Sequence, residues 1–220
     1  KLAEVLLYDV RRTLNVGELN AVFLDPQVEK WLAERTAAAD TRHLIHAPSN
    51  PPGWSAGKWG EWYPDALDPT TQSLTIDIPK PHWRQGWLDQ HDRILESLSA
   101  NRQRTPLVIS GDLHAIGMGE IHRSGDLDFS SNPVTSILSG PVGTSIRGFP
   151  SVVRGIGAMP SSVLDIDEQV APLEEHGFTI VDLLPDRTVV QLFKWDVNSQ
   201  DLAAIDSLVP FHTIELEVPA

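Results

Sequence analysis

Residues 106–114 read Pro-Leu-Val-Ile-Ser-Gly-Asp-Leu-His, and this stretch decides the fold class of the chain. Its apolar part, residues 107–110, is typical of a buried β-strand, and Gly111 lets the backbone turn at the strand end. Asp112 and His114 follow two positions apart, so in an extended segment they project to the same side. Open α/β sheets bind ligands at the carboxyl ends of their strands. The sequence therefore predicts a site at this turn.

The chemistry of the turn suits a metal ion, because a carboxylate and an imidazole that converge there can bind a hard divalent or trivalent cation. A structural role for Asp112 and His114, as a helix cap or a salt-bridged loop, is an open alternative for a single Gly-Asp-x-His sequence. Ser110 is not favoured as a nucleophile, since no Gly-x-Ser-x-Gly elbow surrounds it. The lack of cysteine excludes a thiolate nucleophile and disulfides.

A second histidine, His46, ends the short apolar strand at residues 43–46, and Pro48 turns the chain away directly afterwards. A single histidine after a strand is more often a hydrogen-bonded structural residue. Two histidines at the ends of two parallel strands favour a shared site, because adjacent strands lie only about 5 Å apart. We therefore expect His46 to join Asp112 and His114.

The elements around these strands predict an α/β fold. Residues 3–10 are dense in Val and Leu and are expected to form a buried strand. Asp25 and Pro26 are typical of a helix N-cap and first turn, and apolar residues follow at helical spacing: Val28, Trp31 and Leu32. Residues 83–98 repeat that spacing before the strand at 107–110. This order fits β-α-β units with parallel strands.

The C-terminal part changes to antiparallel β-structure. Residues 119–138 are strand-rich, residues 178–184 and 189–197 alternate as a hairpin with Pro185-Asp186 in its turn, and residues 213–218 form a closing strand. We predict one domain over residues 1–220, interrupted by a long lid-like loop at residues 48–81.

The composition restricts the function. A formal net charge of −13 over 220 residues argues against nucleic-acid binding, which needs clustered Lys and Arg. No apolar run approaches the roughly 20 residues of a membrane span. An anionic substrate would need metal cations at the site to reverse the local negative potential.

The two strand-end motifs resemble the last two metal motifs of calcineurin-like metallophosphoesterases. Leu44-Ile45-His46-Ala47-Pro48 resembles the strand–His–x–Pro motif, and residues 108–114 resemble the final strand motif. Asp112, in place of a first histidine, is similar to the alkaline phosphatase D (PhoD-like) branch. Other stretches agree with that branch in the same order: Tyr8-Asp9-Val10-Arg11, residues 27–32 with Trp31-Leu32, Gly57-Lys58-Trp59, residues 139–155 and Phe193-Lys194-Trp195.

The resemblance implies a layered α/β/β/α sandwich that hydrolyses a small phosphate mono- or diester through a metal-activated water. It implies a binuclear centre in which His46 and Asp112 ligate one metal ion and His114 the other, with Asp112 and His114 as catalytic residues. Fe, Ca, Mn and Zn are not distinguishable. The same resemblance favours an extracytoplasmic location.

Residues 1–44 contain no counterpart of the family's earlier metal motifs. The resemblance therefore implies that the chain is the C-terminal half of such an enzyme and carries only part of the site, with the missing N-terminal half as its partner. On its own, the chain is expected to bind metal weakly and to hydrolyse little.

The loop at residues 48–81 is rich in Trp and allows two further interpretations. In one it is a lid over the metals, with Lys58 pairing with a substrate phosphate; in the other its Trp side chains only hold the loop on the domain. The alternative function is a non-catalytic module whose Trp residues stack on sugar rings or another ligand. Strand-end metal ligands discriminate the two, because such a module has no need of them.

Overall fold

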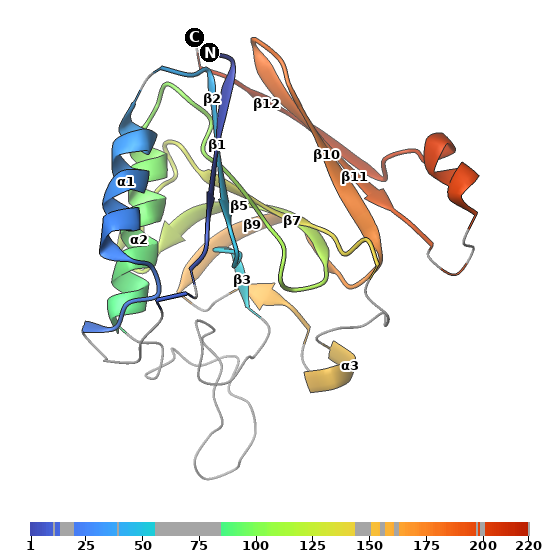
Figure 1. Cartoon of the computed structure of the whole chain (residues 1–220), viewed down its shortest axis with the longest axis horizontal. Helices are drawn as coiled ribbons and strands as arrows, with labels where there is room; N and C mark the ends of the chain where they lie inside the picture. Colours follow the sequence, from blue (N-terminus) through green and yellow to red (C-terminus); the bar gives the residue numbers. More distant parts are fainter. Residues whose placement is uncertain are drawn as a thin grey trace.

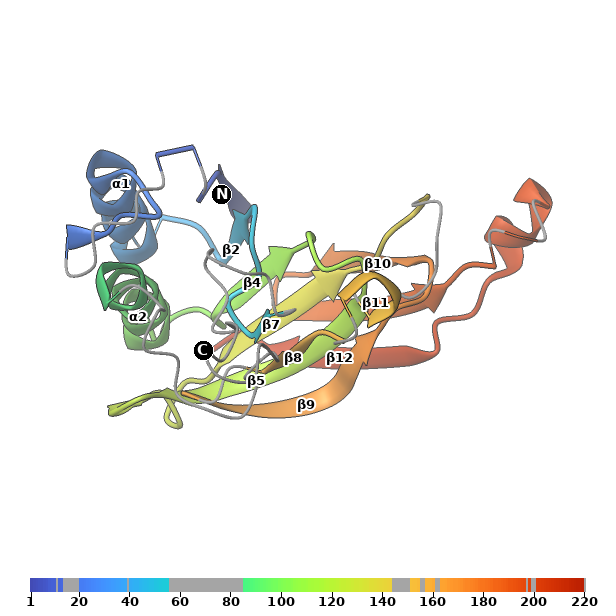
Figure 2. The same cartoon turned by 90° about the horizontal axis from the view of Figure 1, so that it is seen from below.

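The computed structural model describes residues 1–10, 12–13, 20–38, 40–55, 85–143, 151–154, 157–160, 163–196, 198 and 201–219. In this part of the chain two helices, a central sheet and a second sheet form three layers (Figures 1 and 2). The α/β class, the layered arrangement and the antiparallel strands at the C-terminus agree with the prediction.

The central sheet has the strand order β1-β2-β4-β7-β5-β6, with β9 on the other side of β5. Its parallel half confirms the β-α-β interpretation: β1 (Ala3–Tyr8), β2 (His43–Pro48), β4 (Leu107–Ser110) and β7 (Val134–Ser139) all run in one direction. The antiparallel half follows from the strand-rich sequence after Gly111: β5 (Ile116–Ser124), β6 (Leu127–Asp128) and β9 (Leu164–Leu173).

Helices α1 (Pro26–Ala37) and α2 (Gln85–Ala100) cover one face of this sheet. Asp25 is the N-cap of α1 as predicted, since its carboxylate accepts a hydrogen bond from the Gln27 amide at 2.8 Å. Leu32 is buried, whereas Trp31 is 41% exposed and does not belong to the apolar stripe that its spacing predicted. Helix α2 packs on the sheet through Leu95 and Leu98, which share a buried cluster with Val108 and Ile121.

The second sheet lies on the opposite face and consists of β10 (Gly177–Leu183), β11 (Arg187–Lys194) and β12 (His212–Glu217). It confirms the predicted hairpin and closing strand. Its apolar side chains pack on the odd-numbered residues of the parallel strands, among them Ile45 and Leu107. Even-numbered residues of β2 and β4, such as His46 and Val108, therefore face the helices.

Three regions differ from the sequence interpretation or lie outside it. The ten-residue strand β9, which contains Asp165 and Asp167, was not predicted from the sequence, because its apolar and polar residues alternate only weakly. Most of the predicted loop at 48–81 lies outside the described residues; its start forms β3 (Trp54–Ser55), which pairs with β8 (Met159–Pro160). Two short helical segments complete the described elements: α3 (Ser151–Arg154) and a 3-10 turn at Leu202–Ser207.

Neither α1 nor α2, the long helices of the described chain, has the length and apolar content to cross a bilayer.

Candidate metal centre

The turn after β4 holds two non-glycine residues in the left-handed backbone region, Asp112 at φ 69° and His114 at φ 51°. The Leu113 amide donates to the Gly111 carbonyl at 2.9 Å, which closes a tight three-residue turn around Asp112. Such conformations cost about 1–3 kcal/mol each and concentrate at functional sites. From the sequence, Gly111 is expected to allow the chain to turn. The positive φ angles instead occur at the candidate ligands Asp112 and His114.

Leu113 anchors this turn in the core. Its side chain is 2% exposed and belongs to the cluster that also contains Tyr8 and Trp54. Asp112 and His114 on either side are half-buried. The buried leucine therefore offsets the cost of the strained backbone and keeps the two polar residues at the sheet edge.

A third polar side chain reaches the turn from the neighbouring strand. Asn50 follows β2, is 4% exposed, and its Nδ2 donates to Asp112 Oδ2 at 3.3 Å. Asn50 was not predicted from the sequence, because the end of this strand was placed at His46. Its position could have indicated a site residue, because Asn50 lies two residues after Pro48, where β2 ends beside β4.

The end of β1 joins the same edge. Ser49 Oγ donates to Asp9 Oδ1 at 3.1 Å and accepts a hydrogen bond from the Val10 amide at 3.0 Å. The carboxyl ends of β1, β2 and β4 thus bring Asp9, Asn50 and Asp112 to one edge of the sheet. This edge lies at the end of β1 and β2 that is remote from the two chain termini (Figure 1).

His46 does not lie at this edge. It is 1% exposed and occupies the middle of β2, in register with Val108, four residues before Asp112. Its Nε2 is 2.9 Å from Thr36 Oγ1, and its Nδ1 is 3.2 Å from the Tyr8 hydroxyl. These partners lie on α1 and β1, on the helix side of the sheet.

The hydrogen bonds fix the protonation state of His46. The Thr36 hydroxyl donates to the Leu32 carbonyl at 2.7 Å, so its oxygen accepts the hydrogen of His46 Nε2. Nδ1 then accepts from the Tyr8 hydroxyl. Burial, with a contribution from the positive charge of Arg104, lowers the pKa of His46 to about 4, and burial raises the pKa of Tyr8. Both ring nitrogens of a neutral imidazole are therefore in use.

The prediction that His46 is a metal ligand is corrected by this geometry. Neither nitrogen has a lone pair left for a cation, and the side chain points to α1 rather than to the turn. The apolar run was read as ending at His46, whereas β2 continues to Pro48. Asn50 occupies the strand-end position that His46 was expected to fill.

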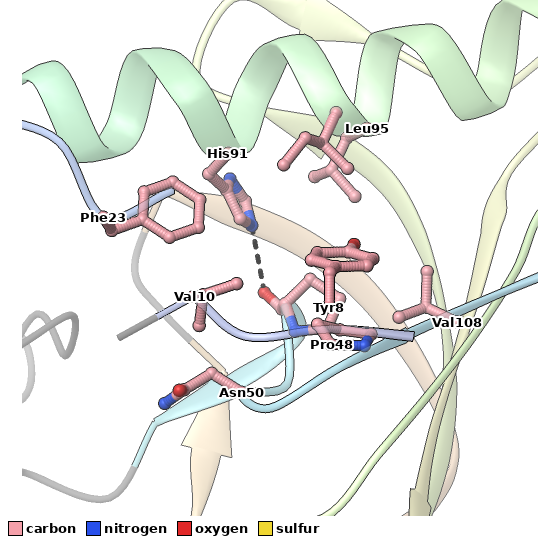
Figure 3. A pocket seen from close by; sticks show the side chains of 10 residues that line it. Tyr8, Val10, Phe23, Pro48, Asn50, His91, Leu95 and Val108 are labelled. Carbon is pink, nitrogen blue, oxygen red and sulfur yellow. Dashed lines mark hydrogen bonds between the residues drawn. The ribbon is translucent and has the colours of Figure 1, made fainter. Parts of the chain in front are cut away.

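A small cavity of about 30 Å³ lies beneath the edge, between α2 and the ends of β1 and β2 (Figure 3). His91 lines it and is 3% exposed; its Nε2 contacts the Pro52 carbonyl at 3.2 Å and its Nδ1 contacts Asp92 at 3.1 Å. Asn50 and Tyr8 line the same cavity. A space of this size holds little more than a water molecule, so it is a packing defect and not a substrate pocket.

The other predicted residues have the following positions. Lys58 lies outside the described residues, as do Trp59 and Trp62. Trp54 is 2% exposed and donates to Glu168 at 2.7 Å, so this Trp does not offer its face to a sugar. Ser110 is buried and donates to the Ile137 carbonyl at 3.3 Å, which agrees with its rejection as a nucleophile.

The described residues do not form a complete metal site. Among these residues no group of three or more His, Cys, Asp or Glu side chains is placed to hold a metal ion. Asp112 and His114, with the amide of Asn50, form at most one side of such a site.

The comparisons with known proteins bear on the fold. No protein-family model matches the chain, and neither does any curated protein sequence. Among solved structures, the structure of PhoD matches with a TM-score of 0.53 over 88% of this chain. The chain has the fold of a part of PhoD. The identity is 12%, and the match covers 36% of the PhoD chain, so the chain spans about a third of its length. The likeness to PhoD therefore shows a PhoD-like partial fold.

Proposed function

We propose that the chain is part of a PhoD-like metal-dependent phosphoric ester hydrolase, in which Asp112 and His114 are metal ligands and catalytic residues. The observation that carries the proposal is the strained turn that holds Asp112 and His114 at the carboxyl edge of three parallel strands. Ligand sites of α/β sheets lie at this edge, and strain of this kind persists where function requires it. The PhoD-like fold supports the same assignment.

The donor atoms available at this edge are of the kinds that bind a hard metal ion. Asp112 offers carboxylate oxygens, His114 an imidazole nitrogen, and Asn50 an amide oxygen once its NH₂ group is turned toward Asp112. Metal ions bound here would activate water and polarise a phosphoryl oxygen. The described residues contribute by fixing the donors: Leu113 anchors the turn, and Asn50 orients Asp112.

Two or three donors do not complete a binuclear centre, so we propose that polypeptide outside residues 1–220 supplies the others. The outermost strand of the central sheet, β1, is suited to pair with this additional polypeptide. β1 has only β2 as a partner among the described strands, and Val5 and Leu7 on it are 57% and 81% exposed. An added strand would cover both side chains and use the free backbone groups of β1. The missing N-terminal half of a PhoD-like enzyme is the partner we propose, and Lys58 remains a candidate phosphate-binding residue.

The substrate class follows from the proposed chemistry and remains a proposal: a small phosphate mono- or diester. An extracytoplasmic location is proposed on the PhoD likeness alone.

The test uses the full polypeptide that contains residues 1–220, loaded in turn with Mn²⁺, Zn²⁺, Ca²⁺ or Fe³⁺. Hydrolysis of p-nitrophenyl phosphate and of bis-p-nitrophenyl phosphate is measured before and after chelation. Removing a metal ligand typically disables the site, so Asp112→Asn and His114→Ala are each expected to lower kcat/KM by about 100-fold or more. Metal content, measured by mass spectrometry, should fall in the same two variants.

His46→Gln is the matched control, because it changes a histidine of the same sheet that the geometry removes from the site. It should keep the metal content of the wild type and most of its activity at a temperature where it is folded. Full activity of His114→Ala in chelator would overturn the proposed function. Loss of metal from His46→Gln but not from His114→Ala would restore the original assignment of His46.

A further inference from the structure

The opposite, amino end of the parallel strands contains an open cleft of about 390 Å³. Its walls come from the residues that precede β1, β2 and β4: Lys1, Asp40, Thr41, Arg42 and Arg104 among them. Figure 1 shows this end of the sheet beside the two chain termini, away from the edge that carries Asp112. The cleft is therefore separate from the candidate metal centre.

Arg104 is the unusual residue of this cleft. It is 3% exposed, and its Nη1 makes a long hydrogen bond of 3.4 Å to Thr41 Oγ1. Its Nε and Nη2 are buried and have no hydrogen-bond partner within the described part of the chain. A buried guanidinium without a counter-ion is costly, and burial lowers the pKa of Arg104.

The nearby carboxylates are already bound to another arginine. Arg35 Nε donates to Glu4 Oε1 at 2.9 Å, and Arg35 Nη2 donates to both oxygens of Asp40 at 3.0 and 3.1 Å. Arg35 also holds the pKa of Glu4 and of Asp40 below their usual values. Arg104 therefore has no carboxylate partner among the described residues.

The remaining charges of the cleft are positive. Lys1 and Arg42 line it beside Arg104, and its only acidic side chain among the described lining residues is Asp40, which Arg35 neutralises. This is a local excess of positive charge in a chain whose formal net charge is −13. A guanidinium binds tetrahedral or planar oxyanions through parallel N–H groups, and Arg104 has two N–H-bearing nitrogens, Nε and Nη2, unused.

We propose that this cleft binds one small oxyanion, of the size of inorganic phosphate, through the guanidinium of Arg104. Thr41 and Arg42 stand at the same wall and would complete the contact. The bound anion supplies the counter-charge that Arg104 lacks. The inference does not depend on the proposed hydrolase function, because the two sites lie at opposite ends of the strands.

The test is titration of the metal-free, chelator-treated protein with inorganic phosphate at constant ionic strength, with chloride as the balancing anion. Calorimetry and the thermal midpoint both report binding. We expect saturable binding with a stoichiometry of one in the wild type, and an affinity at least tenfold weaker in Arg104→Met. Sulfate and acetate arms show whether the site prefers tetrahedral or planar oxyanions, and saturable binding of either supports the proposal.

Arg102→Met is the matched control. It removes an arginine two positions away that is exposed and donates to Ser131 Oγ instead of lining the cleft. It should bind phosphate as the wild type does. Equal loss in both variants would indicate a diffuse charge effect and would overturn the proposal, as would binding that Asp112→Asn abolishes.

A second readout needs no variant and covers the case in which Arg104→Met does not fold. The positive charge of Arg104 contributes to the low pKa of His46, which is about 4. An anion on Arg104 offsets that charge, so phosphate should raise the pKa of His46, followed by NMR of its imidazole resonances. An unchanged His46 titration at saturating phosphate, or the absence of any binding, would mean that the cleft holds only water.

Discussion

The two histidines that the sequence placed in one site, His46 and His114, lie in opposite environments. His46 is 1% exposed, faces the helices from the middle of a strand, and has both ring nitrogens hydrogen-bonded. His114 is half-buried and follows a strand end, with a left-handed backbone at φ 51°. The first is held by two hydrogen bonds, whereas the second is held in a backbone conformation that L-residues rarely adopt.

This difference separates a histidine that stabilises the fold from one that we propose as a metal ligand. A residue that satisfies all its hydrogen bonds in a relaxed strand stabilises the fold. A residue held against its backbone preference costs stability, and such a cost persists where the residue serves a function. Measurements of stability test this comparison, because the free energy of unfolding should respond strongly to substitution of His46 and little to substitution of His114.

The largest effect is expected at His46. His46→Ala removes a packed ring and leaves the Tyr8 and Thr36 hydroxyls short of a partner, so the free energy of unfolding should fall by about 2–4 kcal/mol. His114→Ala should change it by less than about 1 kcal/mol. Urea denaturation at pH 7 measures both. Equal losses at the two positions would remove the distinction drawn between them.

A second effect concerns pH. The pKa of His46 is about 4 in the folded chain, below the value of about 6.5 expected when unfolded, so the unfolded state binds the extra proton first. The stability that His46 contributes is complete above pH 6.5 and is lost as pH falls from 6.5 to 4, by up to about 3 kcal/mol.

Urea midpoints of the wild type and of His46→Gln, taken between pH 7 and pH 4, isolate this contribution. The difference in stability between the two proteins should shrink across that window. Parallel pH profiles would mean that His46 titrates normally and is not held neutral by its surroundings.

The smallest effect is expected for Asp112→Gly, and its sign is opposite to that of His46→Ala. Asp112→Gly places the one residue that tolerates φ 69° without strain, so the free energy of unfolding should rise by up to about 1 kcal/mol. In the full polypeptide the same variant should lose metal. Leu113→Ala is the contrasting change, because Leu113 is 2% exposed and its loss should destabilise by about 2–4 kcal/mol. Destabilisation by Asp112→Gly would show that the turn is not strained.

Sequence reasoning recovered the elements whose signals are local. The Asp25-Pro26 cap, the strands β1, β2 and β4, and the hairpin with Pro185-Asp186 all appear as predicted, except that β1 is not fully buried: Val5 and Leu7 are 57% and 81% exposed. It failed where a pattern was weak or long-range. The sequence of β9 is acidic at its start and alternates weakly, and its pairing with β5 contains register shifts. Trp31 has helical spacing but is 41% exposed.

The sequence by itself determined the fold class, the strand that precedes Gly111 and the candidate ligands Asp112 and His114, because hydrophobic periodicity and strand-end chemistry are local properties. Only the tertiary structure decided that His46 is hydrogen-bonded to Tyr8 and Thr36 and that Asn50 contacts Asp112. Which strand end meets Asp112 depends on where β2 stops and on its register with β4, and both are set by packing between distant segments. The unpaired guanidinium of Arg104 has the same origin, because burial and the capture of nearby carboxylates by Arg35 exist only in the folded chain.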